Sequence, residues 1–292
     1  MQGVMRGLAG WRGGLQRGQR QAHWPMAAGS VRSTLVWSAA LYLLLGAALA
    51  GWLPWWWMAG AVPLLYARLA LALHETMHRH ASPEVGLWLR LCILLESPLV
   101  LGYREHRALH LRHHRFNGGP GDPDRPLIAA APPRALLSAL LVPERAFFEW
   151  VRDRGLDARL ATGCAVRAVL FLAVVALDPA VFLAYWLSLR LSIGLSGFVF
   201  HHVLHAREGR VGSFALPGGP RVLRLGRWLF GREPMLILMR HRAHHLWPRT
   251  PLSELPDLPD DLELPSGRLG PAERHAALIA AARTPRRPPC AA

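Results

Sequence analysis

Four short stretches of the chain concentrate histidine at the spacing of a single helix face. Their histidines, in chain order, are His74, His78 and His80 in HETMHRH; His106, His110, His113 and His114 in EHRALHLRHHRF; His201, His202 and His205 in HHVLH; and His241, His244 and His245 in HRAHHLWP. Side chains three or four residues apart on a helix are neighbours, so two neutral imidazoles can reach one cation. An adjacent pair such as His113 and His114 points in directions about 100° apart, so each ring can serve a different ion. The spacing therefore predicts a site for two metal ions.

Other interpretations of these histidines must be weighed. A lone histidine is more often hydrogen-bonded or exposed than a ligand, but two HxxHH boxes, each near an HxxxH pattern, favour metal binding. HETMH also fits HExxH, the zinc protease signature in which two histidines bind zinc and the glutamate activates water. A protease would leave most of the clustered histidines without a role. An intramembrane zinc protease and a non-catalytic metal-binding membrane protein therefore remain the less favoured alternatives.

Long apolar runs must position these clusters. The runs are Thr34–Leu53, Trp55–Leu73, Cys164–Leu177 and Ala180–Phe200. The first carries no charge and is long enough to cross about 30 Å of hydrocarbon. Arg68 lies close enough to the end of the second to snorkel, whereas Arg190, near the middle of the fourth, must face protein, water or a partner. We predict four transmembrane helices arranged as two hairpins.

The distribution of charge indicates orientation and excludes one class of partner. The net charge of +15 comes from 34 basic residues, all of them arginine, which lie beside the spans rather than along one basic and aromatic face. This argues against nucleic acid binding. The turns Gly51–Trp56 and Asp178–Ala180 contain no basic residue, so the positive-inside rule places both termini and the central loop in the cytoplasm. With no cleavable signal peptide, we expect a multi-pass protein of a bacterial inner membrane.

Both hairpins would return their histidines to one cytoplasmic face. The second span runs into His74 and the fourth ends just before His201. Between them, Gly86–Gly102 is interrupted by charge and proline, so we expect a re-entrant or interfacial helix. An amphipathic helix is expected over Ala135–Val151, and another helix over Val222–Arg240 leads into the last cluster.

The remaining expectations of the sequence concern side chains and boundaries. The helix that carries His110 ends at NGGPGDPDRP, a run of turn formers. In it Asp122 and Asp124 are candidates either to orient ligand imidazoles or to cap a turn. In the helix 135–151, Glu144, Arg145, Glu149 and Arg152 are expected on the wet side. Together these patterns predict an all-α integral membrane protein, with a cytoplasmic helical cap carrying the histidine boxes. Its membrane domain is expected at residues 30–258, between tails at 1–29 and 259–292.

The boxes and their order resemble the membrane fatty acid desaturase superfamily, histidine-box diiron enzymes that include hydroxylases and carotenoid ketolases. HETMH resembles the first box, HLRHHRFNGGPGDPD the second with its Asp-Pro-Asp turn, and HRAHHLWPRTPLSELPDL the third. The resemblance covers Thr34 to Leu258. It implies a cap that holds two iron ions.

The resemblance also implies a ligand set. Carried over box by box, the ligands are His74 and His78; His110, His113 and His114; and His241, His244 and His245. A further ligand after the fourth span corresponds to His205, and the position four residues earlier, often a polar residue that holds a metal-bound water in the family, corresponds to His201. The chain departs from the pattern in its extra histidines His80, His106 and His202, which we regard as candidates for the outer layer of the site.

The activity that the resemblance implies is O₂-dependent introduction of a double bond into a lipid acyl chain. The alternative is a hydroxylase or ketolase of the same superfamily, which no motif in the sequence distinguishes. Electrons must come from a separate donor, such as a ferredoxin or rubredoxin with its reductase, because the chain contains no CxxC, haem or dinucleotide-binding motif.

Overall fold

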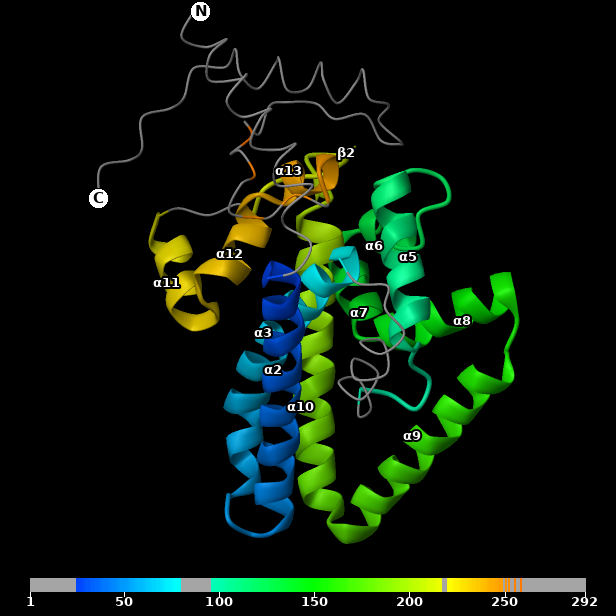
Figure 1. Ribbon diagram of the computed structural model, residues 1–292, viewed down its shortest axis with the longest axis vertical. Helices are drawn as coiled ribbons and strands as arrows, with labels where there is room; N and C mark the ends of the chain where they lie inside the picture. Colours follow the sequence, from blue (N-terminus) through cyan, green and yellow to red (C-terminus); the bar gives the residue numbers. More distant parts are fainter. Residues whose placement is uncertain are drawn as a thin grey trace, which may run out of the picture.

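Four long apolar helices form the body of the protein. The computed structural model describes residues 25–79, 96–216 and 220–248, together with Thr250, Leu252, Leu255 and Leu258. Its helices α2 (Pro25–Leu49), α3 (Met58–Arg79), α9 (Ala158–Leu177) and α10 (Pro179–Gly197) supply four segments long and apolar enough to span a membrane. They form two hairpins (Figure 1), which confirms the predicted spans. Helix α2 begins within the stretch that we expected to be a tail, and His80 lies outside the described residues.

Local chemistry sets the turn of each hairpin. In the first, Gly51 has a positive φ of 72°, and a short 3-10 turn, η1 (Trp55–Trp57), leads into α3. The tryptophans around this turn are exposed, as expected for an interfacial aromatic belt. In the second, the Asp178 carboxylate accepts hydrogen bonds from the backbone N–H groups of Ala180 (2.9 Å) and Val181 (3.0 Å). This N-cap and Pro179 at the first helical position start α10 immediately after α9.

The core of the bundle lies between α2, α3 and α10. Its buried side chains include Leu41 and Leu45 of α2, Leu69 of α3 and Leu189 of α10. Helix α9 slants away from this trio (Figure 1) and exposes most of its apolar side chains, as a lipid-facing helix does. At the other end of the bundle, α10 packs closely on α7 (Pro132–Ala139), because Gly194 has no Cβ that would collide with the side chain of Leu140.

Two arginines within the spans donate hydrogen bonds to backbone carbonyl groups that lie outside helices. Residues 96–102 run without helix beside α9 and α10, and Arg167 of α9 donates hydrogen bonds to the carbonyls of Pro98 (3.3 Å) and Val100 (2.6 Å). Carbonyl groups at membrane depth need such partners. Arg190 of α10 forms a two-pronged ion pair with Glu144 of α8 (Val142–Arg154) and donates to the Leu140 carbonyl at 3.1 Å. The arginine in the middle of the fourth span therefore faces protein.

Three expectations about the cap were wrong. The helix expected over Ala135–Val151 is two helices, α7 and α8. In a continuous helix, Pro143 would lack its N–H donor and its ring would clash with the carbonyl of Ala139. Glu144 was expected on the wet side, but it turns inward to Arg190. The helix expected over Val222–Arg240 is broken at Gly231, whose φ is 94°, into α11 (Pro220–Phe230) and α12 (Arg232–Met239). Of the helix expected over Gly86–Gly102, only the non-helical residues 96–102 are described.

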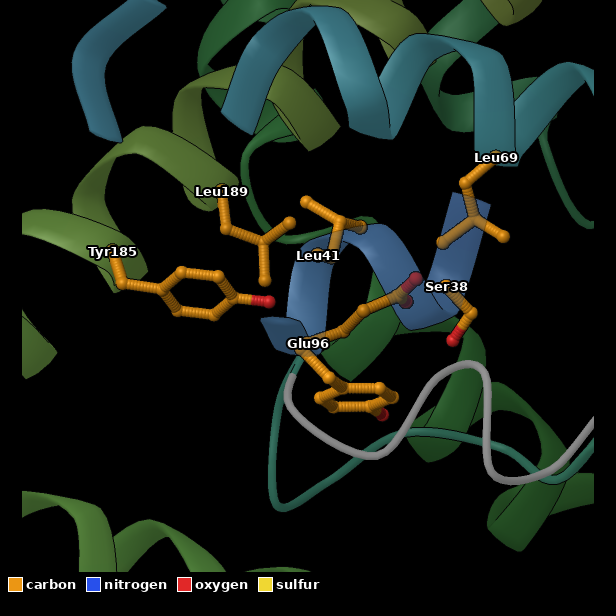
Figure 2. A pocket seen from close by; sticks show the side chains of 7 residues that line it. Ser38, Leu41, Leu69, Glu96, Tyr185 and Leu189 are labelled. Atoms are coloured by element: carbon orange, nitrogen blue, oxygen red, sulfur yellow. The ribbon is translucent and has the colours of Figure 1, made fainter. Parts of the chain in front are cut away.

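A buried carboxyl group lies among the spans. Figure 2 shows Glu96 reaching from the 96–102 loop towards Ser38 of α2, with Tyr185 and Leu189 of α10 nearby. These side chains line a cavity of about 10 Å³, which is close to the smallest volume that holds one water molecule. Tyr66 donates a hydrogen bond to the Glu96 carboxylate.

The remaining elements make up the cap at the end of the bundle opposite the hairpin turns (Figure 1). They are α5 (Tyr103–Phe116), α6 (Arg125–Ile128), the π-helical turn η2 (Phe198–Val203) that follows α10, the strands β1 (Ala206–Arg207) and β2 (Arg210–Val211), and α13 (His241–Leu246). The two strands pair antiparallel. Every described histidine cluster lies at this end.

Candidate metal centre

Four segments far apart in the sequence deliver the predicted ligands to one place. Helix α3 continues beyond its apolar run to Arg79 and carries His74 and His78. Helix α5 and helix α13 each contribute one HxxHH box. The π-helical turn η2, a feature frequent at functional sites, ends two residues before His205.

The imidazoles separate into two groups. The first, the five-histidine group, consists of His74, His78, His110, His114 and His244, with one ring nitrogen of each within 4.8 Å of the others. Within it, Nε2 of His78 lies 2.8 Å from Nε2 of His110 and 3.0 Å from Nε2 of His244. The second, the three-histidine group, consists of His113, His205 and His245.

His241 joins the edge of the three-histidine group. Its Nε2 lies 2.9 Å from Nε2 of His205, which in turn lies 3.1 Å from Nε2 of His113. The two groups also touch each other, because the rings of His114 and His245 stack with centroids 4.1 Å apart. The site is therefore one continuous cluster of imidazoles with two centres.

Each adjacent pair of histidines is divided between the two groups. His113 and His114 follow each other in α5, and His244 and His245 follow each other in α13, yet each pair supplies one ring to either group. The divergence of neighbouring side chains on a helix produces this division. Both helices thus contribute to both centres.

The protonation that the hydrogen bonds impose fits a bound cation in the three-histidine group. His205 donates its Nδ1–H to the Gly212 carbonyl at 2.7 Å, and Nδ1 of His113 lies 3.0 Å from an oxygen of the Asp122 carboxylate. In their neutral forms both rings therefore present bare Nε2 lone pairs to each other. A cation held by His113 and His205 would remove that repulsion, in the place of a proton that would otherwise lie between the two nitrogens.

Two rings, one from each group, give a second sign of the same chemistry. Among the described residues, no hydrogen-bond partner faces either ring nitrogen of His114 or of His245, although both rings are enclosed. Buried polar atoms without partners are rare in proteins. Ring nitrogens 2.8–3.1 Å apart could share one ion, because an imidazole nitrogen lies about 2.0–2.1 Å from a bound zinc. The residues fit imidazole-bound metal.

Electrostatics keeps most of these rings in the form that binds metal. Burial lowers the pKa of His110 and His114, and the neighbouring imidazoles lower it further. Burial likewise lowers the pKa of His205, His241 and His245. Because only neutral imidazole can donate a lone pair, these shifts favour ligation.

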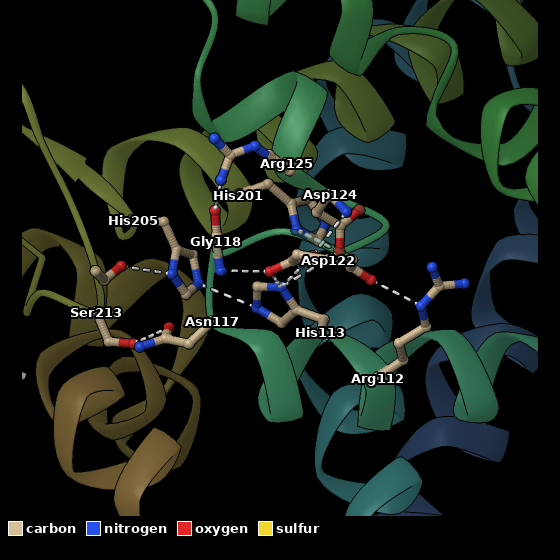
Figure 3. A network of polar contacts seen from close by, with 12 residues as sticks. Arg112, His113, Asn117, Gly118, Asp122, Asp124, Arg125, His201, His205 and Ser213 are labelled. Atoms are coloured by element: carbon tan, nitrogen blue, oxygen red, sulfur yellow. Dashed lines mark hydrogen bonds and ion pairs between the residues drawn. The ribbon is translucent and has the colours of Figure 1, made fainter. Parts of the chain in front are cut away.

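Asp122 orients His113. Burial opposes ionisation of this carboxyl group, but the contact with His113 and hydrogen bonds from the backbone N–H groups of Gly118 and Asp124 bring its pKa below the usual value. Conversely, burial acts to lower the pKa of His113, and the Asp122 carboxylate outweighs it, so that the pKa is raised. Figure 3 shows Asp122 between His113 and the turn that follows α5. It both caps that turn and fixes the imidazole, so the two roles considered for it coexist.

Asp124 and two further histidines lie beside this pair. One Asp124 oxygen is 3.3 Å from Nδ1 of His201 and 3.5 Å from Nδ1 of His113, and these three residues form a third possible set of ligands. His201 thus contacts the side of the three-histidine group rather than the five-histidine group. Burial lowers the pKa of His106. The charge of Asp124 acts to raise this pKa, and His201 acts to lower it.

His202 lies apart from both histidine groups. Its ring stacks on Phe198 with centroids 5.1 Å apart, and its Nδ1 is 3.2 Å from the carbonyl of Leu127. It therefore joins η2 to α6. The structure assigns it a packing role.

No pattern in the sequence predicted the backbone that orients His205. Gly212, whose carbonyl accepts the His205 hydrogen bond, follows β2, and the neighbouring Ser213 donates to the side chain of Asn117 at the end of α5. Asn117 has a left-handed φ of 43°, and Gly118 follows with a φ of 79° where a Cβ would collide with Val211. A short hairpin and a glycine turn therefore connect the second box to His205, the predicted ligand after the fourth span.

Comparison with known proteins agrees with this arrangement. The family model described as Fatty acid desaturase matches residues 50–264, a range that contains all four histidine clusters and three of the four spans in full. No curated protein and no solved structure gives a significant match. With the match extending over most of its length, the chain belongs to the fatty acid desaturase family.

Proposed function

We propose that the protein is an O₂-dependent, non-haem diiron oxidase that introduces a double bond into the acyl chain of a membrane lipid. The observation that carries the proposal is the convergence of imidazoles from four segments into two adjoining groups, each able to hold one ion. The family implies an oxidoreductase. Imidazole is a suitable ligand for iron as well as for zinc and copper, and iron is the choice that the family favours.

The residues of the chain would hold two irons in distinct surroundings. The five-histidine group would bind one and the three-histidine group, with His241, the other. Two irons held there would supply the chemistry that activates O₂ and removes hydrogen from an unactivated C–H bond. Asp122 holds the His113 ring in the orientation that presents Nε2 to the centre, and the Gly212 carbonyl does the same for His205. Such outer contacts fix both the ring orientation and the tautomer of a ligand.

The position of the cluster suits a lipid substrate. His74 and His78 lie at the last turns of a helix that spans the apolar layer, so the centre is at the boundary where a lipid chain meets the cap. We infer that this boundary faces the cytoplasm of a bacterial cell, where a ferredoxin or rubredoxin with its reductase would supply electrons. The excess of arginine over acidic residues in the sequence, 34 against 19, would favour an acidic carrier.

The number of imidazoles argues against a zinc protease. A catalytic zinc site uses three protein ligands and keeps one position for water. Around His74 and His78 the structure gathers three further imidazoles. That set leaves no open water position on a tetrahedral zinc.

The test is analysis of metal and lipid products in cells that produce the protein. We expect two irons per chain and a new double bond in acyl lipids. In His110→Ala, which removes a ring from the five-histidine group, the iron held by that group and the double bond should be lost. The matched control is His202→Asn, because His202 lies outside both groups and an asparagine amide can still donate to the Leu127 carbonyl. It should keep both metal and product.

Other results of this experiment would indicate a different function. A new oxygen in place of a double bond would identify the hydroxylase or ketolase alternative. One zinc per chain, or lipid products that do not depend on His110, would refute the oxidase.

A further inference from the structure

Helix α11 has an unusual arrangement of exposed side chains. Val222, Leu225 and Trp228 recur every three residues and are 54%, 56% and 77% exposed. Three exposed arginines, Arg221, Arg224 and Arg227, recur at the same spacing. The helix contains no acidic residue. One row of apolar side chains and one row of cations therefore run side by side along its outer surface.

The inward face of α11 is packed against the rest of the protein. Gly226 is buried against Met235 of α12, whose sulfur would lie 2.7 Å from a Cβ at that position. Leu223 and Phe230 pack on the same apolar cluster. The exposed apolar row is thus additional to the side chains that α11 already uses to hold its place.

Contacts with α3 place α11 at the edge of the membrane layer. Arg68 of α3 donates to the Leu229 carbonyl at the end of α11, at 2.7 and 3.2 Å, and its guanidinium lies 4.8 Å from the ring centroid of Trp37 in α2. Arg68 lies five residues before Leu73, where the apolar run of α3 ends, and so about 8 Å along the helix from that end. Figure 1 shows α11 beside the upper parts of α2 and α3, on the opposite side from α8.

We propose that α11 is a membrane-surface helix that binds anionic phospholipids of the leaflet next to the metal centre. Val222, Leu225 and Trp228 lie among the acyl chains, and Arg221, Arg224 and Arg227 contact the lipid phosphates. The apolar row continues the lipid-facing side of the first hairpin, so its partner is a lipid. Because α11 has three arginines and no acidic residue, the headgroup of that lipid is anionic. An apolar row beside a basic row, on a helix at the level of the headgroups, is the pattern of interfacial helices.

The contact of α11 with the leaflet affects the last histidine box, because α12 links α11 to α13. Helix α12 packs on α11, and Arg240 is the single residue between the end of α12 and the start of α13. Helix α13 carries His241, His244 and His245. Attachment of α11 to the leaflet thereby anchors the last histidine box at the membrane boundary.

The experiment measures lipid binding to the full-length protein purified in a neutral detergent. Native mass spectrometry follows the binding of phosphatidylglycerol and of phosphatidylcholine. The variant Arg221→Gln/Arg224→Gln/Arg227→Gln should bind phosphatidylglycerol on the order of a hundredfold more weakly than wild type, from about fivefold for each arginine near an anionic surface. Phosphatidylcholine binding should be unchanged.

The matched control removes the same charge elsewhere. Arg152, Arg154 and Arg159 are exposed residues of α8 and α9, and their joint replacement by glutamine should leave phosphatidylglycerol binding within about twofold of wild type. An equal loss in both triple variants would overturn the proposal, since it would indicate a general charge effect. So would unchanged phosphatidylglycerol binding in the α11 variant, including the case in which that variant loses binding of an acidic electron carrier instead. The single variant Arg224→Gln, with an expected loss of about fivefold, decides the matter if the triple variant does not fold.

Discussion

Replacing Asp122 with asparagine tests how far the metal centre depends on its outer contacts. The two carboxylate oxygens accept from Nδ1 of His113 at 3.0 and 3.1 Å, from the Asp124 N–H at 2.8 Å and from the Gly118 N–H. Asparagine keeps one acceptor oxygen and turns an NH₂ group towards a donor. The Nδ1–H of His113 then loses its charged partner, and the ring is free to rotate or to change tautomer.

The expected loss follows from these contacts. Hydrogen bonds to a charged group contribute about 1.5–3 kcal/mol each, but only the part that acts through His113 reaches the metal. Loss of an outer contact of this kind weakens metal binding about 10- to 100-fold, which is about 1.4–2.8 kcal/mol. Because His113 belongs to the three-histidine group, the ion held there should be lost first.

The assay is metal content after dialysis against increasing concentrations of chelator. In Asp122→Asn, one of two ions should leave at a chelator concentration about 10- to 100-fold lower than in wild type, while the other is retained. Asp153→Asn is the control, since Asp153 is exposed and pairs with Arg112 and Arg152. If Asp122→Asn releases metal no more readily than Asp153→Asn, and circular dichroism shows both folded, the argument about ring orientation is refuted.

Three further perturbations address the membrane bundle, each read out by thermal unfolding in detergent. Gly194→Ala should destabilise the protein by about 1–3 kcal/mol, because the added Cβ would overpack against Leu140, the residue after α7. Gly46→Ala, where no atom lies within 4 Å of the added Cβ, should be neutral or slightly stabilising; equal effects would contradict this. Arg190→Leu alone should cost about 3–5 kcal/mol by stranding the Glu144 charge, and adding Glu144→Leu should recover most of that loss; a double variant no better than the single would refute the pairing. Burial raises the pKa of Glu96 from 4.5 to about 7, so the folded protein binds the proton more tightly than the unfolded chain does. The free energy of unfolding should therefore fall by about 3 kcal/mol as pH rises from 4.5 to 7 and then level off. Glu96→Gln should remove this contribution to the pH dependence, and an unchanged slope would contradict the assignment.

The bundle could be predicted from sequence because its signals are local. A membrane span needs only length and apolar composition, and α2, α3, α9 and α10 have both. The spacing of His110, His113 and His114 likewise reports which rings share a helix face. These features follow from the period of one helix and require no knowledge of its neighbours.

The features that were not predicted from the sequence depend on contacts between distant segments. Glu144 was expected to face water because its own helix is amphipathic, but its position is decided by Arg190 on another helix. The orientation of His205 depends on the Gly212 carbonyl, which a two-residue strand pair brings back. The interruption at Pro143 is the exception, since the proline was visible in the sequence and the expected helix ran through it.

The ion pair between α8 and α10 also bears on how the chain is made. Glu144 precedes Arg190 by 46 residues, so during synthesis the counter-ion leaves the ribosome before the cation that it neutralises. A lone arginine at mid-span resists transfer into lipid. With Glu144 already synthesised when Arg190 enters the bilayer, the order of translation favours docking of the cap helix and insertion of the last span as a single event in biogenesis.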